Sequence, residues 1–354
     1  MANAKNRIIT LSGQPATGKS TVKNILIQKY KEMGFEVKEF ATGDKFREYF
    51  SDMVELLIAV KNKDSEKCNQ LSQKEGIRKI MYTSDGSLKQ ESVKMIKETL
   101  DIMEERNFDF NSFDIEKANN SKSLSKIRKQ IDLVIDRYIK EDLRNQINSS
   151  EKPNEIWIID SRLAWNNIPE DESFSVRLIS EEKVAGERAY KRFLQNFDNF
   201  VEMISKSHIL NAINLKDKLL EINEKSKDEM NDEQKLQSKF DILETIINTC
   251  SDIKLKNQYF KKLLGIKEES YENLDIAIEK IAARKQGENE RYKERYQVDL
   301  DDENNYKLIV DTSNLTPEEE AEMIVEAEQK SYTRNGYMVP EINKNIKDND
   351  DIDR

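Results

Sequence analysis

Histidine and cysteine are scarce in this sequence of 354 residues, which contains one histidine and two cysteines. The lone His208 argues against a histidine-based triad and against a metal centre built from several histidines. We expect it to be a surface or partly packed residue. Cys68 and Cys250 are too few for a disulfide framework or a multi-cysteine metal site. The chemistry of this chain therefore has to depend on other side chains.

Long apolar runs and an excess of positive charge are also lacking. No run approaches the roughly 20 apolar residues that span a bilayer. The apolar run of residues 8–11 near the start is too short for a signal peptide. Lys and Arg number 58 against 68 Asp and Glu, a net charge of −10, which argues against a dedicated nucleic-acid binder. We expect a cytoplasmic protein without a membrane or nucleic-acid partner.

Glycine and proline are few, and their spacing predicts where helices lie. Neither residue occurs between Glu187 and Leu264, a stretch rich in Leu, Ile, Lys and Glu, so we expect helices there. Residues 51–150 have a similar helical character. Apolar runs that predict strands lie outside these two regions, at residues 7–11, 35–40, 156–159, 174–179 and 306–310. We therefore predict an α/β fold: a three-layer structure with a parallel five-stranded sheet and large helical insertions.

Several helix ends can be predicted from local residues. The run 21–33 has one apolar face, and Gly34 is expected to end that helix. Ser180, followed by two acids, suits a helix start. Thr316 to Glu319 form a capping box with proline at the first helical position.

The segment Gly13-Gln-Pro-Ala-Thr-Gly-Lys-Ser20 matches the phosphate-binding P-loop pattern (Walker A) at full spacing. It follows a predicted strand and opens a predicted helix. Its glycines let backbone N–H groups surround a phosphate, Lys19 offsets phosphate charge, and the Ser20 hydroxyl suits Mg²⁺. The residues expected to bind ATP are Gly13, Ala16, Thr17, Gly18, Lys19, Ser20 and Thr21.

Three further charged clusters are expected near the same strand ends. They are Thr42 to Arg47, Asp160-Ser-Arg162, and a group formed by Arg188, Arg192, Arg284, Glu288 and Arg291. Ligands of open α/β sheets bind beyond the carboxyl ends of the strands. Asp160 there could hold Mg²⁺ through water, together with Ser20. A solvated charged surface is the alternative interpretation of these residues.

The order of these segments resembles the cytidylate kinases and their relatives. These P-loop nucleoside monophosphate kinases transfer the γ-phosphoryl group of ATP to an acceptor nucleotide. The resemblance covers residues 7–50, 132–194 and 270–330. Its motifs are A-T-G-D-K-F-R-E, I-I-D-S-R-L-A, G-E-R-A-Y-K-R, R-K-Q-G-E-N-E-R-Y and Y-K-L-I-V-D-T-S. Ala16 and Ser161 stand where the family usually has glycine.

The resemblance implies roles for individual residues, with Mg²⁺ as cofactor and CMP or dCMP as the favoured acceptor. The implied catalytic residues are Lys19, Arg162, Arg188 and Arg284. The implied acceptor-binding residues are Thr42, Arg47, Asp160, Arg162, Glu288 and Arg291. Asp132 and Asp136, four residues apart on a predicted helix, resemble an acidic pair of some relatives and suggest a further acceptor contact.

The resemblance also implies a division of the chain. We expect the P-loop and the start of the kinase core in 1–50, a helical acceptor-side region in 51–150, and core strands with the start of a lid in 151–194. A helical insertion at the lid position (195–270), the end of the core (271–330) and a polar tail (331–354) follow. The insertion is also a candidate surface for a protein partner. Two alternatives stay open: a kinase for another nucleotide or a small hydroxyl compound, and a non-catalytic ATP-binding regulatory protein.

Overall fold

A parallel sheet of five strands lies at the centre of the computed structural model, which describes residues 7–83, 85–105, 122–150, 154–163, 166, 168, 172–207, 215–224 and 230–334. The strands are β1 (Arg7–Gly13), β2 (Glu36–Ala41), β3 (Glu155–Asp160), β4 (Phe174–Ile179) and β5 (Leu308–Asp311). Their order across the sheet is β2-β3-β1-β4-β5, with every neighbouring pair parallel. The predicted α/β fold is confirmed.

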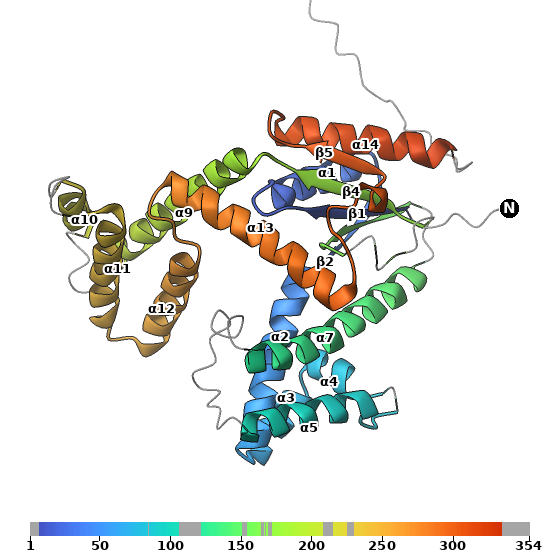
Figure 1. The fold of residues 1–354 in the computed structure, drawn as a ribbon, viewed down its shortest axis with the longest axis horizontal. Coiled ribbons are helices and arrows are strands. Elements are labelled where there is room, and N and C mark those ends of the chain that lie inside the picture. The colour runs from blue at the N-terminus through green and yellow to red at the C-terminus, as the bar shows by residue number, and fades with distance from the viewer. Residues whose placement is uncertain are drawn as a thin grey trace, which may run out of the picture.

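Helices cover both faces of this sheet and form two extensions beyond it (Figure 1). In chain order, those within the described ranges are α1 (Lys19–Glu32), α2 (Thr42–Lys61), α3 (Ser65–Ser72), α4 (Glu75–Met81), α5 (Gln90–Glu105), α7 (Lys122–Asn148), α9 (Glu182–Ser205), α10 (Leu215–Glu224), α11 (Asp232–Asn248), α12 (Ile253–Glu268), α13 (Leu274–Tyr296) and α14 (Pro317–Arg334).

Helices α1 and α14 cover one face of the sheet. Leu26 and Tyr30 of α1 and Ile324 of α14 are fully buried against the apolar side chains of β1, β3 and β4. The burial of these side chains supplies most of the attraction between the layers. Gly34 has a φ of 86°, a left-handed angle that glycine adopts without strain, and α1 ends just before it as predicted.

The opposite face carries a second core, shared with helices α2 to α7, the region expected to lie on the acceptor side. Phe40, Trp157 and Ile159 point from the strands into this core, where they pack with Met53 and Ile135. Successive side chains of a strand alternate between the faces of a sheet. Side chains of the same apolar runs therefore enter two hydrophobic cores, one on each face of the sheet.

Helices α9 to α12 and the first half of α13 form a third core of their own. Phe197, Phe240 and Leu263 are among its buried residues. The helices α9 and α13 touch closely at Gly186, where an added Cβ would lie 2.7 Å from the Cα of Ile278. The described part of the stretch between Glu187 and Leu264 is helical, as predicted.

One of the two predicted helix caps is present. Thr316 and Glu319 exchange the hydrogen bonds of a capping box at the start of α14, as predicted. The helix start predicted at Ser180 to Glu182 is confirmed, because α9 begins at Glu182, but the N-cap residue is Glu181 rather than Ser180. The backbone N–H of Glu181 donates instead to the hydroxyl of Ser313, at 2.9 Å. A side chain from the loop after β5 thus contacts the backbone just before α9.

Some expectations concern residues outside the described ranges. His208, the side chain of Asp44 and the tail beyond residue 334 belong to this group. Among the described residues, no helix combines the length and apolarity that a membrane crossing requires.

Candidate active site

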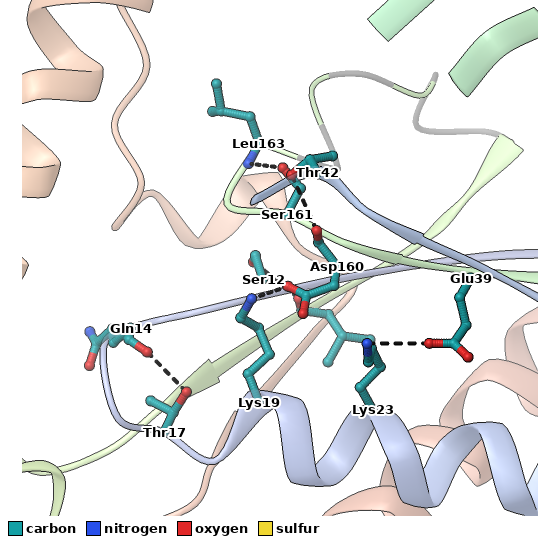
Figure 2. A network of polar contacts seen from close by, with 11 residues as sticks. Ser12, Gln14, Thr17, Lys19, Lys23, Glu39, Thr42, Asp160, Ser161 and Leu163 are labelled. Carbon is teal, nitrogen blue, oxygen red and sulfur yellow. Dashed lines mark hydrogen bonds and ion pairs between the residues drawn. The ribbon is translucent and has the colours of Figure 1, made fainter. Parts of the chain in front are cut away.

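The loop between β1 and α1 turns through backbone angles that favour glycine. Gly18 has a φ of 81° and Ala16 a φ of 59°, both in the left-handed region. Inside the loop, the hydroxyl of Thr17 donates to the carbonyl of Gln14 at 3.0 Å (Figure 2). Because α1 begins at Lys19, its first N–H groups lack helical acceptors and carry the positive end of the helix dipole. The loop can therefore accept an anion.

Lys19 contacts the carboxylate of Asp160 at the end of β3 (Figure 2). The two side chains are 22% and 15% exposed. Burial lowers the pKa of Lys19, and the charge of Asp160 opposes that change. The hydroxyl of Thr42, at the start of α2, donates to the carbonyl of Asp160 at 3.2 Å. Three segments thus meet beside the loop, while Ser20 and Thr21 lie exposed in the first turn of α1.

A second charged group lies on the middle of α13. The carboxylate of Glu288 contacts Arg162, from the loop after β3, and accepts a hydrogen bond from Nε of Arg284 at 3.1 Å. Burial, together with the charges of nearby Arg284 and Arg291, lowers the pKa of Arg162 to about 10. One carboxylate therefore holds arginines from two segments close together.

Tyr292 borders this arginine group and was not predicted from the sequence. Arg291 lies over the Tyr292 ring, 5.5 Å from its centroid. Burial raises the pKa of Tyr292, and Arg162 and Arg291 act against that rise. The only signal in the sequence is its place directly after Arg291. Its aromatic face supports a guanidinium.

The arginines of α9 have other neighbours. Arg188 donates to the hydroxyl of Thr312 at 2.7 Å and to its carbonyl at 2.6 Å, at the end of β5. Arg192 lies near Tyr271 of the insertion core and acts to lower the pKa of that phenol, which burial raises. The structure therefore does not bring Arg188 into the Glu288 group.

Arg47 lies on the second turn of α2 with an exposed side chain. Its guanidinium passes beside Gly43, where an added Cβ would lie 3.7 Å from Nη1. It follows Thr42 on the helix that starts at the strand end. Arg47 thus lies near the segment that contacts Asp160.

A small, partly open hollow lies between α13 and the loop after β1. Arg162 and Glu288 line it, so it adjoins the charged groups described above. Its other polar lining residues include Arg177, Lys285 and Asn289, which were not predicted. Arg177 itself contacts Asp301 and lies 5.2 Å from the ring centroid of Tyr306.

The site offers few groups to a metal ion. In the part of the chain that the structure describes, no three His, Cys, Asp or Glu side chains are arranged to hold one. The Ser20 hydroxyl and the Asp160 carboxylate are hard oxygen donors, which fit Mg²⁺ that keeps several waters and is bound mainly by substrate phosphates.

Similarity to known proteins is limited to a short region. No protein-family model matches the chain. Cytidylate kinase of Methanococcus maripaludis (strain C5) is 38% identical over 69 residues, which are 18% of this chain and 39% of that protein. Cytidylate kinase of Methanococcus vannielii is 42% identical over 48 residues, 14% of this chain and 28% of that protein. The chain thus matches less than half the length of these relatives. The similarity indicates a P-loop-kinase-like region within the chain.

Proposed function

We propose that the chain is an ATP- and Mg²⁺-dependent nucleoside monophosphate kinase. The main support is the contact of Glu288 with Arg162 and Arg284, next to the Lys19–Asp160 pair. Phosphoryl transfer passes through a loose transition state with charge on several oxygens, so cations and positioning supply most of the catalysis. A site rich in arginines suits this reaction, which needs no histidine.

On the ATP side, the loop from Gly13 to Gly18 would surround the phosphates with backbone N–H groups. Lys19 would leave Asp160 and neutralise the β- and γ-phosphates, because phosphate oxygens carry more negative charge than one carboxylate. Ser20 and Asp160 would hold Mg²⁺, directly or through water. When bound, Mg²⁺ neutralises charge that develops on the phosphate oxygens.

On the acceptor side, Arg47 and Arg162 would bind the acceptor phosphate and align it with the transferred group. Thr42 would fix the start of α2 against β3, as its bond to Asp160 indicates. Glu288 and Arg291 would contact the acceptor nucleotide. Arg284 would be able to leave Glu288 and bind phosphate oxygens, because its side chain is 51% exposed and can move. Burial of a guanidinium such as Arg162 strengthens its interaction with phosphate.

We propose CMP or dCMP as the acceptor, which rests on the cytidylate kinase similarity alone. Helices α9 to α13 would form the lid that excludes water during transfer. Arg188 would reach the phosphates only after lid closure, since it contacts Thr312 in this structure.

A non-catalytic ATP-binding protein is the second candidate. The separate hydrophobic core of α9 to α13 favours it, because such a unit can also serve as a docking surface for a protein partner. Such a protein would have no use for the acceptor-side arginines Arg47 and Arg162.

ADP formation from Mg-ATP distinguishes these functions. CMP, dCMP, UMP, AMP, GMP and dTMP would be offered separately, beside a reaction without acceptor. Turnover with CMP or dCMP far above that control would support the kinase, and a different preferred nucleotide would change the acceptor. Equal, slow ADP release in all reactions would favour an ATPase or a binding protein.

A further inference from the structure

Helix α13 contacts the acceptor-side helix α7 through polar side chains near its C-terminal end. Asp132 of α7 forms an ion pair with Arg295, and these side chains are 4% and 8% exposed. One turn along α7, Asp136 accepts a hydrogen bond from the hydroxyl of Tyr296. The two acids share a helix face because they lie four residues apart. The end of α13 is therefore held by two adjacent contacts.

These contacts join helices that pack in different hydrophobic cores. Ile131 and Ile135 of α7 belong to the core of the acceptor-side helices. Ala277 and Ile281 of α13 belong to the core of the insertion. A buried ion pair offsets the lost hydration of its charges only when its geometry is good. The Asp132–Arg295 pair therefore fixes one placement of α13 relative to α7.

The helix held in this way carries the arginine group of the site. Arg291 precedes Arg295 by one turn, and Arg284 lies about 16 Å back along the axis at 1.5 Å per residue. The helix is continuous over this length, from Leu274 to Tyr296. Figure 1 shows it running from the insertion to α7. Anchoring at both ends thus sets where Arg284 and Arg291 lie.

We propose that Asp132 and Asp136, with their partners Arg295 and Tyr296, are positioning residues for the acceptor nucleotide. They act through α13, by holding Arg284, Glu288 and Arg291 over the acceptor site. This inference rests on the proposed kinase function. The same contacts couple the positions of the acceptor-side helices and of the insertion, because a movement of α7 would also move the arginines of α13.

A double-mutant cycle in steady-state kinetics tests the proposal. Asp132→Asn and Arg295→Gln should each raise the acceptor KM about 10-fold and leave the ATP KM within about 2-fold, because the P-loop is untouched. The double variant should show about the same 10-fold increase, because both changes break one interaction. Unchanged acceptor KM values in the single variants, or an increase near 100-fold in the double variant, would overturn it.

The matched control is Glu294→Gln. Glu294 pairs with Lys129 between the same two helices at 3.7 Å, but these side chains are 74% and 40% exposed. An exposed pair contributes little, so the control should keep the acceptor KM of the wild type. An equal rise in this variant would contradict a specific role of the buried pair.

Amide hydrogen exchange without nucleotide separates this proposal from the kinase function. Exchange over residues 284–296 should be faster in Asp132→Asn than in the wild type and in Glu294→Gln. Unchanged exchange would refute the anchoring of α13 whatever the reaction is. A wild type that phosphorylates no nucleotide would refute the kinase function, while exchange would still test the contact.

Discussion

Glu288 contacts Arg162, so a residue of α13 neutralises an arginine that follows β3. In Glu288→Gln, the positive charges of Arg162 and Arg284 lose their shared carboxylate. We expect the acceptor KM to rise about 10-fold, equivalent to ~1.4 kcal/mol, because the arginines then repel one another out of position. Initial rates at varied acceptor concentration measure this. Glu290→Gln, an exposed change two residues along α13, is the control, and equal KM values in both variants would contradict the expected role.

Lys19→Ala should reduce kcat by at least about 100-fold, because a cation at the transferred phosphate is lost. Single-turnover measurements would report the chemical step. Lys23→Ala is a matched control one turn further along α1. Lys23 pairs with Glu39 at 3.3 Å and points away from Asp160 (Figure 2), so its removal should leave kcat unchanged. Comparable rates in the two variants would show that Lys19 does not act on the phosphates.

Arg47→Ala should mainly raise the acceptor KM, by about 10-fold, because a side chain that binds the acceptor phosphate is removed. The ATP KM should stay the same. Lys61→Ala, at the far end of the same helix, serves as the control for any general effect on α2. Untouched acceptor kinetics in Arg47→Ala would remove this residue from the acceptor site.

Gly186→Ala tests the close contact of α9 with α13. The added Cβ would lie 2.4 Å from Cγ1 and 2.7 Å from Cα of Ile278, too near for either helix to keep its place. We expect the free energy of unfolding to fall by about 2 kcal/mol. Gly265→Ala in α12, where an added Cβ meets no atom within 4 Å, should instead raise stability slightly. Urea unfolding of both variants checks this, and equal stabilities would refute the contact.

The stability of the protein should depend on pH because of the buried side chain of Glu320. Its side chain is buried, and burial raises its pKa from 4.5 to about 7, with Arg188 acting against the rise. The folded chain therefore binds this proton more tightly than the unfolded chain. The resulting stabilisation is complete below about pH 4.5 and is lost as the pH rises to about 7.

Urea unfolding at pH 5.5 and pH 7.5 would measure this effect. The stability of the wild type relative to Glu320→Gln should be greater at the lower pH, by on the order of 1 kcal/mol. Glu326→Gln, an exposed change on the same helix, should show no such difference. If the difference in the free energy of unfolding between the wild type and Glu320→Gln were the same at both pH values, the raised pKa would be contradicted.

The sequence was sufficient for the strands and for the approach of Lys19 to Asp160. Apolar runs such as Ile156 to Ile159 can only be buried, and parallel strands bring Lys19 and Asp160 to the same edge. Partners that depend on tertiary packing could not be predicted. Arg188 contacts Thr312, and Ser313 accepts a hydrogen bond from the N–H of Glu181, because β5 lies beside β4.

Contacts between helices that lie far apart in the sequence could not be predicted either. Gly186 looks like any helix glycine until Ile278 lies against it. Asp132 and Asp136 were correctly placed on one helix face, but nothing in their spacing indicated Arg295 and Tyr296 as partners. The left-handed φ of Ala16 likewise results from the fold of its loop. Glycine would suit that position because it adopts such an angle without strain.

In the proposed reaction, the γ-phosphate of ATP moves to a nucleotide. ATP labelled in its γ-phosphate, incubated with the protein, Mg²⁺ and CMP, would follow this transfer. We predict that the label appears in CDP and that Lys19→Ala prevents this. Label found only in inorganic phosphate, or retained in ATP with every nucleoside monophosphate offered, would contradict the proposed reaction.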